Sequence, residues 1–203
     1  MKSFSRDILV TILIAMLSFF VMHASIQSAV VIGPSMEPTV EEQQRLLVNK
    51  LVYFFHAPER GDVVIFQPPN KSQPDYIKRI IGVPGDTVEI KNGYVYLNSK
   101  KLDEPYIKDR PTYNLSAKRL AENNYFVLGD NRNNSNDSHN GWTVTRPDII
   151  GKAWLRIWPP NEWGVIPNGQ IDTQLAGLDV TLHTLTNQTN GQNQWYSWMA
   201  TLQ

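Results

Sequence analysis

The 203-residue sequence contains no cysteine. A chain without thiols cannot form a disulfide framework, a thiolate zinc site or a cysteine nucleophile, so three classes of protein are excluded. Basic and acidic residues number nineteen each, and the formal net charge is zero. No bulk positive field is therefore available to attract nucleic acid, and we expect no nucleic-acid partner.

Several common catalytic motifs are also missing. The sequence has no G-x-S-x-G nucleophile turn, no S-x-x-K and no H-E-x-x-H. The four histidines have no partner serine by motif, which argues against a Ser-His-Asp hydrolase. Without the metallopeptidase pattern we expect no metal ion, and nothing in the sequence calls for an organic cofactor.

The N-terminal segment Ile8–Met22 is almost wholly apolar, and no residue from 8 to 32 has a fixed charge. With the weakly polar residues that follow, it approaches the roughly 20 residues that cross a bilayer as a helix. Lys2 and Arg6 precede the segment, whereas the first charge after it is Glu37. The positive-inside rule therefore predicts a single-pass helix in the cell membrane, with a cytoplasmic N-terminus and the remaining chain outside. A cleavable secretion signal is the alternative.

After Thr39 the chain changes to short runs of β-branched and aromatic residues divided by turn residues, as in an all-β domain. Asn92-Gly93 between two such runs predicts a tight type I′ hairpin. Residues 103–121 have the composition of a long loop, with a helical turn expected near 115–121. The predicted strands are Arg45–Phe55, Val63–Gln67, Tyr76–Gly82, Thr87–Ile90, Tyr94–Leu97, Tyr125–Leu128 and Ile149–Trp158.

Composition divides the chain into three predicted parts. These are a cytoplasmic N-terminus with its transmembrane anchor (1–28), a mainly β domain (29–160) and a polar C-terminal extension (161–203). Asparagine and glutamine dominate residues 187–194, which favours a flexible tail. The aromatic cluster at 195–198 either docks on the domain, rests at the membrane interface or belongs to an irregular terminus.

A serine paired with a distant lysine remains as the catalytic system. Lys78 falls in a predicted strand whose alternation places it with Tyr76 and Ile80, against apolar groups. A lysine acts as a general base only when neutral, and loss of water lowers its pKa from about 10.4 toward about 7–8. Adjacent Arg79, a like charge, would push the pKa in the same direction.

Ser35 follows the apolar segment closely and lies between Pro34 and the turn at Glu37-Pro38. It would lose its proton to Lys78, attack a peptide carbonyl and form an acyl-enzyme. The backbone N–H of Ser35 is the natural oxyanion donor. The sequence therefore predicts a serine endopeptidase with a Ser-Lys dyad.

Four blocks of this sequence, in this order, resemble those of type I signal peptidases, a family of membrane-anchored Ser-Lys leader peptidases. They are Ser35-Met36, RGDVVIF (60–66), KRIIGVPGD (78–86) and Gly129–Gly141. One block alone is usually structural, whereas four in order are specific. The resemblance implies a signal-peptidase-like, barrel-like β-sheet domain that cleaves secretory preproteins at the outer face of the lipid bilayer.

The resemblance also implies roles for individual residues. Ser135 would hydrogen-bond Lys78 and orient it, and Asp137 would brace the site through an ion pair. A shallow apolar pocket for the small residue before the cut would be lined by Met36, Tyr76 and Ile77. The substrates would have small side chains one and three residues before the scissile bond. A scaffolding role is expected for Asp130, Asn131 and Arg132.

Three positions depart from the family pattern. Gly33 stands where some members have a second serine as oxyanion donor, Asn133 stands where Asp is usual, and His139 stands where Arg is usual. These departures concern the support of the site and not the dyad. Two alternatives remain open: another Ser-Lys maturation peptidase, and a membrane-tethered, catalytically silent β-domain that binds partner proteins.

Overall fold

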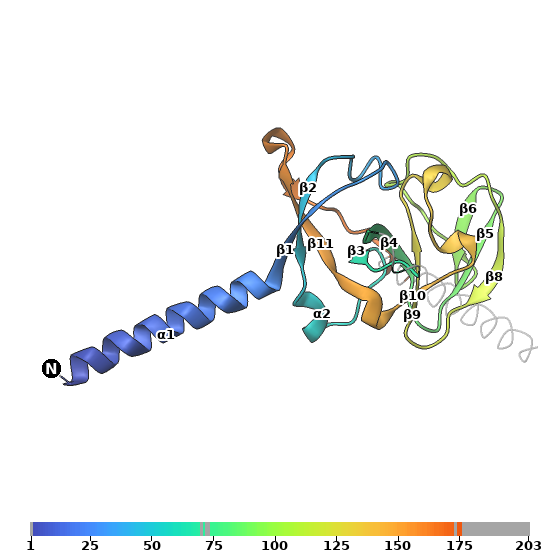
Figure 1. The fold of residues 1–203 in the computed structure, drawn as a ribbon. Coiled ribbons are helices and arrows are strands. Elements are labelled where there is room, and N and C mark those ends of the chain that lie inside the picture. The colour runs from blue at the N-terminus through green and yellow to red at the C-terminus, as the bar shows by residue number, and fades with distance from the viewer. Residues whose placement is uncertain (1, 70, 72–73, 173, 176–203) are drawn as a thin grey trace, which may run out of the picture. The chain divides into compact units, whose positions relative to one another are not determined.

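The computed structural model describes residues 2–69, 71, 74–172 and 174–175 (Figure 1). The chain divides into a compact unit, Met1–Gly169, and a second unit, Gln170–Gln203, of which only five residues near its start are described. The compact unit includes residues 161–169, which the sequence assigned to the C-terminal extension. Strand β12 (Gly164–Val165) lies within this stretch and pairs with β11. The polar segment 187–194 and the aromatic cluster 195–198 lie outside the described residues.

Two antiparallel sheets form the compact unit, so the mainly β fold class is confirmed (Figure 1). The larger sheet has the order β1-β2-β11-β3-β4-β9-β10, with β12 beside β11, and the smaller has the order β7-β6-β5-β8. The remaining strands are β1 (Ile26–Val30), β2 (Arg45–Asn49), β3 (Val63–Phe66), β4 (Tyr76–Gly82), β5 (Thr87–Lys91), β6 (Tyr94–Leu97), β7 (Lys100–Lys101), β8 (Leu115–Arg119), β9 (Asn124–Leu128), β10 (Val144–Thr145) and β11 (Ile149–Trp158).

Two α-helices are described, α1 (Lys2–Ser25) and α2 (Val52–Phe55). Within the described residues, none of the helices combines the length and the hydropathy needed to cross a bilayer. The predicted transmembrane helix therefore stays a prediction. Short 3-10 helices complete the elements: η1 (Arg132–Asn134), η2 (Ser138–Asn140), η3 (Arg146–Asp148) and η4 (Pro160–Glu162).

Two sequence predictions are wrong in their detail. The strand predicted at Arg45–Phe55 ends at Asn49, because the Asn49 side-chain oxygen accepts the N–H groups of Leu51 and Val52 and turns the chain into α2. The helical turn expected near 115–121 is strand β8, which pairs with β5. The sequence LSAKR has few β-branched or aromatic residues, so its local preference for a strand is weak. Pairing with β5 decides its conformation.

The hairpin at Asn92-Gly93 is confirmed. Both residues have positive φ, 52° and 76°, and they join β5 to β6 with Lys91 opposite Tyr94. Asparagine and glycine tolerate this region of φ/ψ space better than other residues, so the local sequence alone determines the turn.

Strand β4 lies between β3 and β9 in the middle of the larger sheet. Every residue from Ile77 to Gly82 is buried. The side chain of Lys78 is therefore shielded from water, which disfavours its charged form.

Candidate active site

Ser35 and Lys78, which are 43 residues apart in sequence, are in direct contact. The Lys78 Nζ lies 2.7 Å from the Ser35 Oγ and donates to the Ile77 carbonyl at 2.9 Å. Lys78 is 4% exposed, and Ser35 is half-buried in the turn that follows Val31. The structure thus brings together the two residues that the sequence predicted as a catalytic pair, with their reactive atoms at hydrogen-bond distance.

Burial lowers the pKa of Lys78 from 10.5 to about 8, and the carboxylates of Asp137 and Asp130 oppose this shift. Arg79 was expected to lower the pKa further as a like charge. Its guanidinium instead donates to both oxygens of Asp130, at 2.9 and 2.8 Å, so its charge is paired. Desolvation therefore drives the shift, and a sizeable fraction of Lys78 is neutral at mildly alkaline pH.

Asn131 holds the backbone on both sides of the Ser35 α-carbon. Its backbone N–H donates to the Ser35 carbonyl at 3.0 Å, and its side-chain amide donates to the Pro34 carbonyl at 3.1 Å. In a planar trans peptide the C=O and N–H point in opposite directions. The Pro34 carbonyl also accepts the N–H of Glu37 at 3.2 Å, so Asn131 and Glu37 together orient the N–H of Ser35 away from themselves. The sequence suggested only scaffolding here, because the contact depends on residues 97 positions apart.

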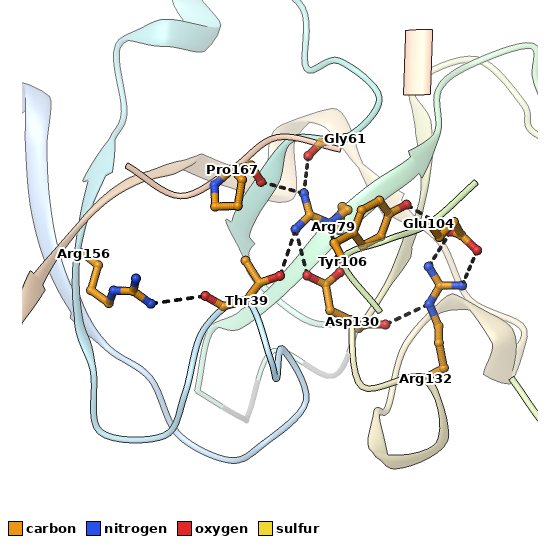
Figure 2. A network of polar contacts seen from close by, with 10 residues as sticks. Thr39, Gly61, Arg79, Glu104, Tyr106, Asp130, Arg132, Arg156 and Pro167 are labelled. Atoms are coloured by element: carbon orange, nitrogen blue, oxygen red, sulfur yellow. Dashed lines mark hydrogen bonds and ion pairs between the residues drawn. The ribbon is translucent and has the colours of Figure 1, made fainter. Parts of the chain in front are cut away.

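A buried polar network fastens the same loop to β4 (Figure 2). Besides Asp130, the Arg79 guanidinium donates to the carbonyls of Gly61 and Pro167, at 2.8 and 3.0 Å, and its face lies 4.3 Å from the Tyr106 ring centre. Arg79 and Asp130 are both fully buried. Removal of one partner of such a pair typically costs about 3–5 kcal/mol, so the network holds the loop rigidly beside Lys78.

The loop continues in Arg132, whose guanidinium binds both carboxylate oxygens of Glu104 at 3.0 and 2.6 Å (Figure 2). Its Nε donates to the Gly129 carbonyl at 3.1 Å. The segment from Gly129 to Arg132 is therefore held by ion pairs at two of its four residues. This arrangement agrees with the scaffolding role expected from the sequence.

Ser135 does not make the expected hydrogen bond to Lys78. Among the described residues its Oγ is buried without a partner, while Lys78 is engaged with Ser35 and Ile77. The hydroxyl instead lies against Gly129, where an added Cβ would overlap both the Ser135 Oγ and the Ser35 carbonyl oxygen. Gly129 therefore permits the close approach of the nucleophile's backbone and Ser135.

Asp137, expected to brace the site through an ion pair, is fully buried and contacts His139 and the backbone of Gly129. Its Oδ1 lies 2.6 Å from Nδ1 of His139, and its Oδ2 accepts the N–H of Gly129 at 2.9 Å. Residues 138–140 form η2, with Asp137 as its N-cap. The capping geometry brings Asp137 and His139 together, and the His139 ring also stacks on Tyr113 at 4.1 Å.

Asn133, another departure from the family pattern, connects two loops. Its side-chain oxygen accepts from the N–H and hydroxyl of Thr112, both at 2.9 Å, and its amide donates to the Arg110 carbonyl at 2.9 Å. An aspartate could not donate to Arg110. The asparagine is therefore matched to the backbone that it contacts in this chain.

A cleft of about 460 Å³ opens beside the dyad. Its lining includes Tyr76 and Ile77, as predicted, together with Ser35 and Lys78. Met36, predicted to line the same pocket, is 0% exposed and packs in the core cluster with Val40 and Val63. The other lining residues are Gln27, Ala29, Val30, Val31, Ile32, Leu46, Ile65, Pro74, Asp75 and Asn136.

One wall of this cleft comes from β1, a strand that the sequence analysis did not predict. Gln27, Ala29 and Val30 of β1 all line the cleft. The weak signal for this strand was the alternation in IQSAV directly after the apolar segment, which was interpreted as part of the helix. Predominantly apolar walls beside Ser35 and Lys78 suit the binding of small apolar side chains.

Comparisons with known proteins identify the family to which this chain belongs. Residues 4–158 match the family model described as signal peptidase, peptidase S26. The chain is 46% identical over 137 residues to the probable signal peptidase I-1 of Synechocystis sp., covering 64% of this chain and 70% of that protein. It is 36% identical over 182 residues to signal peptidase IB of Staphylococcus aureus, covering 80% and 94% respectively. A solved signal peptidase I of Enterococcus faecalis V583 is 30% identical, has a TM-score of 0.43, and covers 48% of this chain and 97% of that chain.

Proposed function

Since the chain belongs to the signal peptidase family, peptidase S26, and is a serine endopeptidase of the signal peptidase I type, we propose that Ser35 and Lys78 remove signal peptides from secretory preproteins. The observation that carries the residue assignment is the 2.7 Å contact between the Ser35 Oγ and a buried Lys78 amine. A solvated surface lysine would be almost fully protonated near neutral pH, whereas burial lowers the pKa of Lys78 to about 8.

In the proposed reaction the neutral amine of Lys78 takes the proton from the Ser35 hydroxyl as its Oγ attacks the scissile carbonyl. The oxyanion is stabilised by the N–H of Ser35, which Asn131 orients through the Pro34 carbonyl. The Lys78 ammonium then protonates the leaving amine, and the signal peptide remains as an ester on Ser35. Water, deprotonated by Lys78, hydrolyses this ester and restores both side chains.

The proposed substrates have small side chains one and three residues before the cut, and the predominantly apolar cleft beside Ser35, which Tyr76 and Ile77 line, supports this preference. The test is incubation of the detergent-solubilised full chain with a preprotein that has an Ala-x-Ala site, followed by mass spectrometry. We expect one cut directly after the second alanine. A matched preprotein with tryptophan at that position should remain intact.

Lack of cleavage by a folded protein would favour the alternative of a silent binding domain. Cleavage restricted to the enzyme's own chain would favour another Ser-Lys maturation peptidase. Either outcome would contradict the proposed function.

We further propose that α1 attaches the enzyme to the cell membrane, with the N-terminus in the cytoplasm and the catalytic domain outside. Support comes from the charges at Lys2 and Arg6 before the apolar segment, and from the exposed fractions of the described large apolar side chains between Ile8 and Phe20, which run from 45% to 72%. Because the chain has no cysteine, single cysteines at Lys2 and Lys91 can test this topology. A membrane-impermeant maleimide should label Lys91→Cys but not Lys2→Cys in intact spheroplasts, and labelling of both would contradict the orientation.

The pH dependence of cleavage follows from the lowered pKa of Lys78, about 8. The reaction requires the neutral amine, so kcat/KM should rise about tenfold per pH unit below this value and level off above it. The profile should be measured from pH 6 to 10 with two peptides that differ in the residue before the cut. Coincident rising limbs near pH 8 support Lys78 as the base, whereas a flat profile below pH 8 would argue against it.

Asn131→Asp should lower kcat about tenfold or more with little change in KM. The carboxylate cannot donate to the Pro34 carbonyl, which then keeps only the 3.2 Å bond from the Glu37 N–H, so the Ser35 N–H is less firmly directed. The backbone N–H of residue 131 still binds the Ser35 carbonyl. Asn133→Asp is the matched control, because it makes the same chemical change in the same loop. An equal loss of kcat in both variants would show that Asn131 has only a general structural role.

A further inference from the structure

The loop that contains Ser35 is built from turns. Residues 31–44, termed the nucleophile loop, are all described, and they contain no helix or strand between β1 and β2. The loop is closed at its base, where the N–H of Val31 donates to the Gln44 carbonyl and the N–H of Gln43 donates to the Val31 carbonyl, both at 2.9 Å. The position of the Ser35 hydroxyl therefore depends on the segments that hold this loop from outside.

One such segment follows the part of the chain that the family model matches. The match ends at residue 158, and residues 160–169, termed the strap, come after it. The strap begins with η4, in which the Glu162 carboxylate accepts the side-chain amide of Gln44 at 2.6 Å. Gln44 is 3% exposed, so this bond is shielded from water. Because the backbone of Gln44 closes the nucleophile loop, the strap is bonded to the base of that loop.

Ile166, in the middle of the strap, packs in the core that supports the nucleophile. It is 5% exposed and belongs to the same cluster as Met36 and Val40 of the nucleophile loop. Its N–H donates to the Trp154 carbonyl of β11 at 2.9 Å, which fixes it to the sheet. Protein interiors are close-packed and transmit changes in volume. A change at Ile166 is therefore transmitted to Met36, the residue next to Ser35.

The end of the strap is bonded to the buried network beside β4 (Figure 2). The Arg79 guanidinium donates to the Pro167 carbonyl at 3.0 Å and to the Thr39 hydroxyl of the nucleophile loop at 3.4 Å. Gly169 adds a backbone bond, from its N–H to the Gly61 carbonyl at 3.1 Å. A buried guanidinium requires acceptors for its donors, so this one group joins the strap to the nucleophile loop.

From these contacts we propose that the strap is a positioning element of the active site, in which Glu162, Ile166 and Pro167 hold the nucleophile loop in place. The inference rests on the proposed function of Ser35 and Lys78. Among the described residues, none of those that line the cleft belongs to the strap. The strap therefore aligns the reacting atoms and does not bind the substrate. A misalignment of about 1 Å can slow a reaction about a hundredfold.

The first test is Ile166→Ala in the detergent-solubilised full chain, with cleavage of an Ala-x-Ala peptide measured over a range of substrate concentrations. We expect kcat to fall at least about tenfold while KM changes less than about twofold, because alignment and not binding is lost. Ile166→Val, which retains most of the side chain, should keep most of the activity.

Ile90→Ala is the matched control for Ile166→Ala. It removes the same atoms from a fully buried position in the smaller sheet. Both alanine variants should melt at a lower temperature than the unmodified chain, because each leaves a cavity in a core. Well below the melting temperature, only Ile166→Ala should lose kcat.

Glu162→Ala is a second test that leaves the core unchanged. The side-chain amide of Gln44 then loses its acceptor, and kcat should fall about threefold to tenfold at an unchanged KM. Glu162→Gln keeps an oxygen that can accept from Gln44, so this conservative variant should retain nearly full activity.

An equal loss of kcat in Ile90→Ala and Ile166→Ala would show only a general contribution to stability, and a raised KM at unchanged kcat would assign the strap to substrate binding. Either result would overturn the positioning role. If Ile166→Ala does not fold, the two variants of Glu162 decide, and full activity of both would contradict the proposal. An unmodified chain that cleaves no preprotein peptide would overturn the proposed function itself, and the positioning role with it.

Discussion

Ser35→Ala and Lys78→Ala are each expected to reduce kcat/KM by at least about 10³-fold, and the double variant to be no worse than either single one. Each change removes half of one catalytic unit, and losses within such a unit are not additive. Ser35→Ala removes the attacking oxygen, whereas Lys78→Ala leaves a hydroxyl whose proton has no acceptor within reach. The measurement is cleavage of an Ala-x-Ala peptide by detergent-solubilised full-length variants.

Matched changes at exposed positions control for substitution itself. Ser116 and Lys91 are a serine and a lysine on the smaller sheet, and both are exposed. Ser116→Ala and Lys91→Ala should retain full activity, and all variants should melt as cooperative folded proteins. Substantial cleavage by Lys78→Ala, or a double variant far worse than both single ones, would mean that Ser35 and Lys78 do not act together.

Gly129→Ala should reduce kcat/KM by about 10²-fold or more. The new methyl group would overlap both the Ser35 carbonyl oxygen and the Ser135 hydroxyl, so the backbone of the nucleophile must move. A displacement of about 1 Å at a reacting group can cost a factor of this size. The φ of Gly129 is not in the left-handed region, so alanine adds steric conflict without backbone strain.

Gly164→Ala is the control for this prediction, because the nearest atom to its added Cβ is 4.0 Å away. It should be fully active. Ser135→Gly in the Gly129→Ala background removes one of the two overlaps but not the one with the Ser35 carbonyl, so it should restore only part of the activity. Normal activity of Gly129→Ala at an unchanged melting temperature would show that the loop adjusts without moving Ser35.

Local sequence determined much of the scaffold. The strand β4 and the Asn92-Gly93 hairpin were predictable because alternation and turn chemistry act over a few residues. The contact between Ser35 and Lys78 was predictable for a different reason. Once thiol, histidine and metal chemistry were excluded, Ser35 and a lysine in an apolar strand remained as the catalytic pair, and the order of four blocks made that choice specific.

Contacts between distant segments were not predictable in the same way. Met36 was expected in the pocket but is buried in the core, since its neighbours in space and not its neighbours in sequence decide which way it faces. Ser135 was expected to bind Lys78, yet the loop places its hydroxyl against Gly129. The turn of the chain into α2 likewise depends on one side chain, Asn49.

By itself, then, the sequence selected Ser35 and Lys78 as the proposed nucleophile and base, because a desolvated lysine in an apolar strand can lose its proton near neutral pH. The tertiary structure decided how that chemistry is supported, through the two contacts of Asn131 with the backbone of Pro34 and Ser35 and the buried pair of Arg79 and Asp130. The physical reason is the distance along the chain over which each effect acts. Propensity and alternation act over a few residues, whereas hydrogen-bond geometry, burial and steric fit depend on segments that only the folded chain brings together.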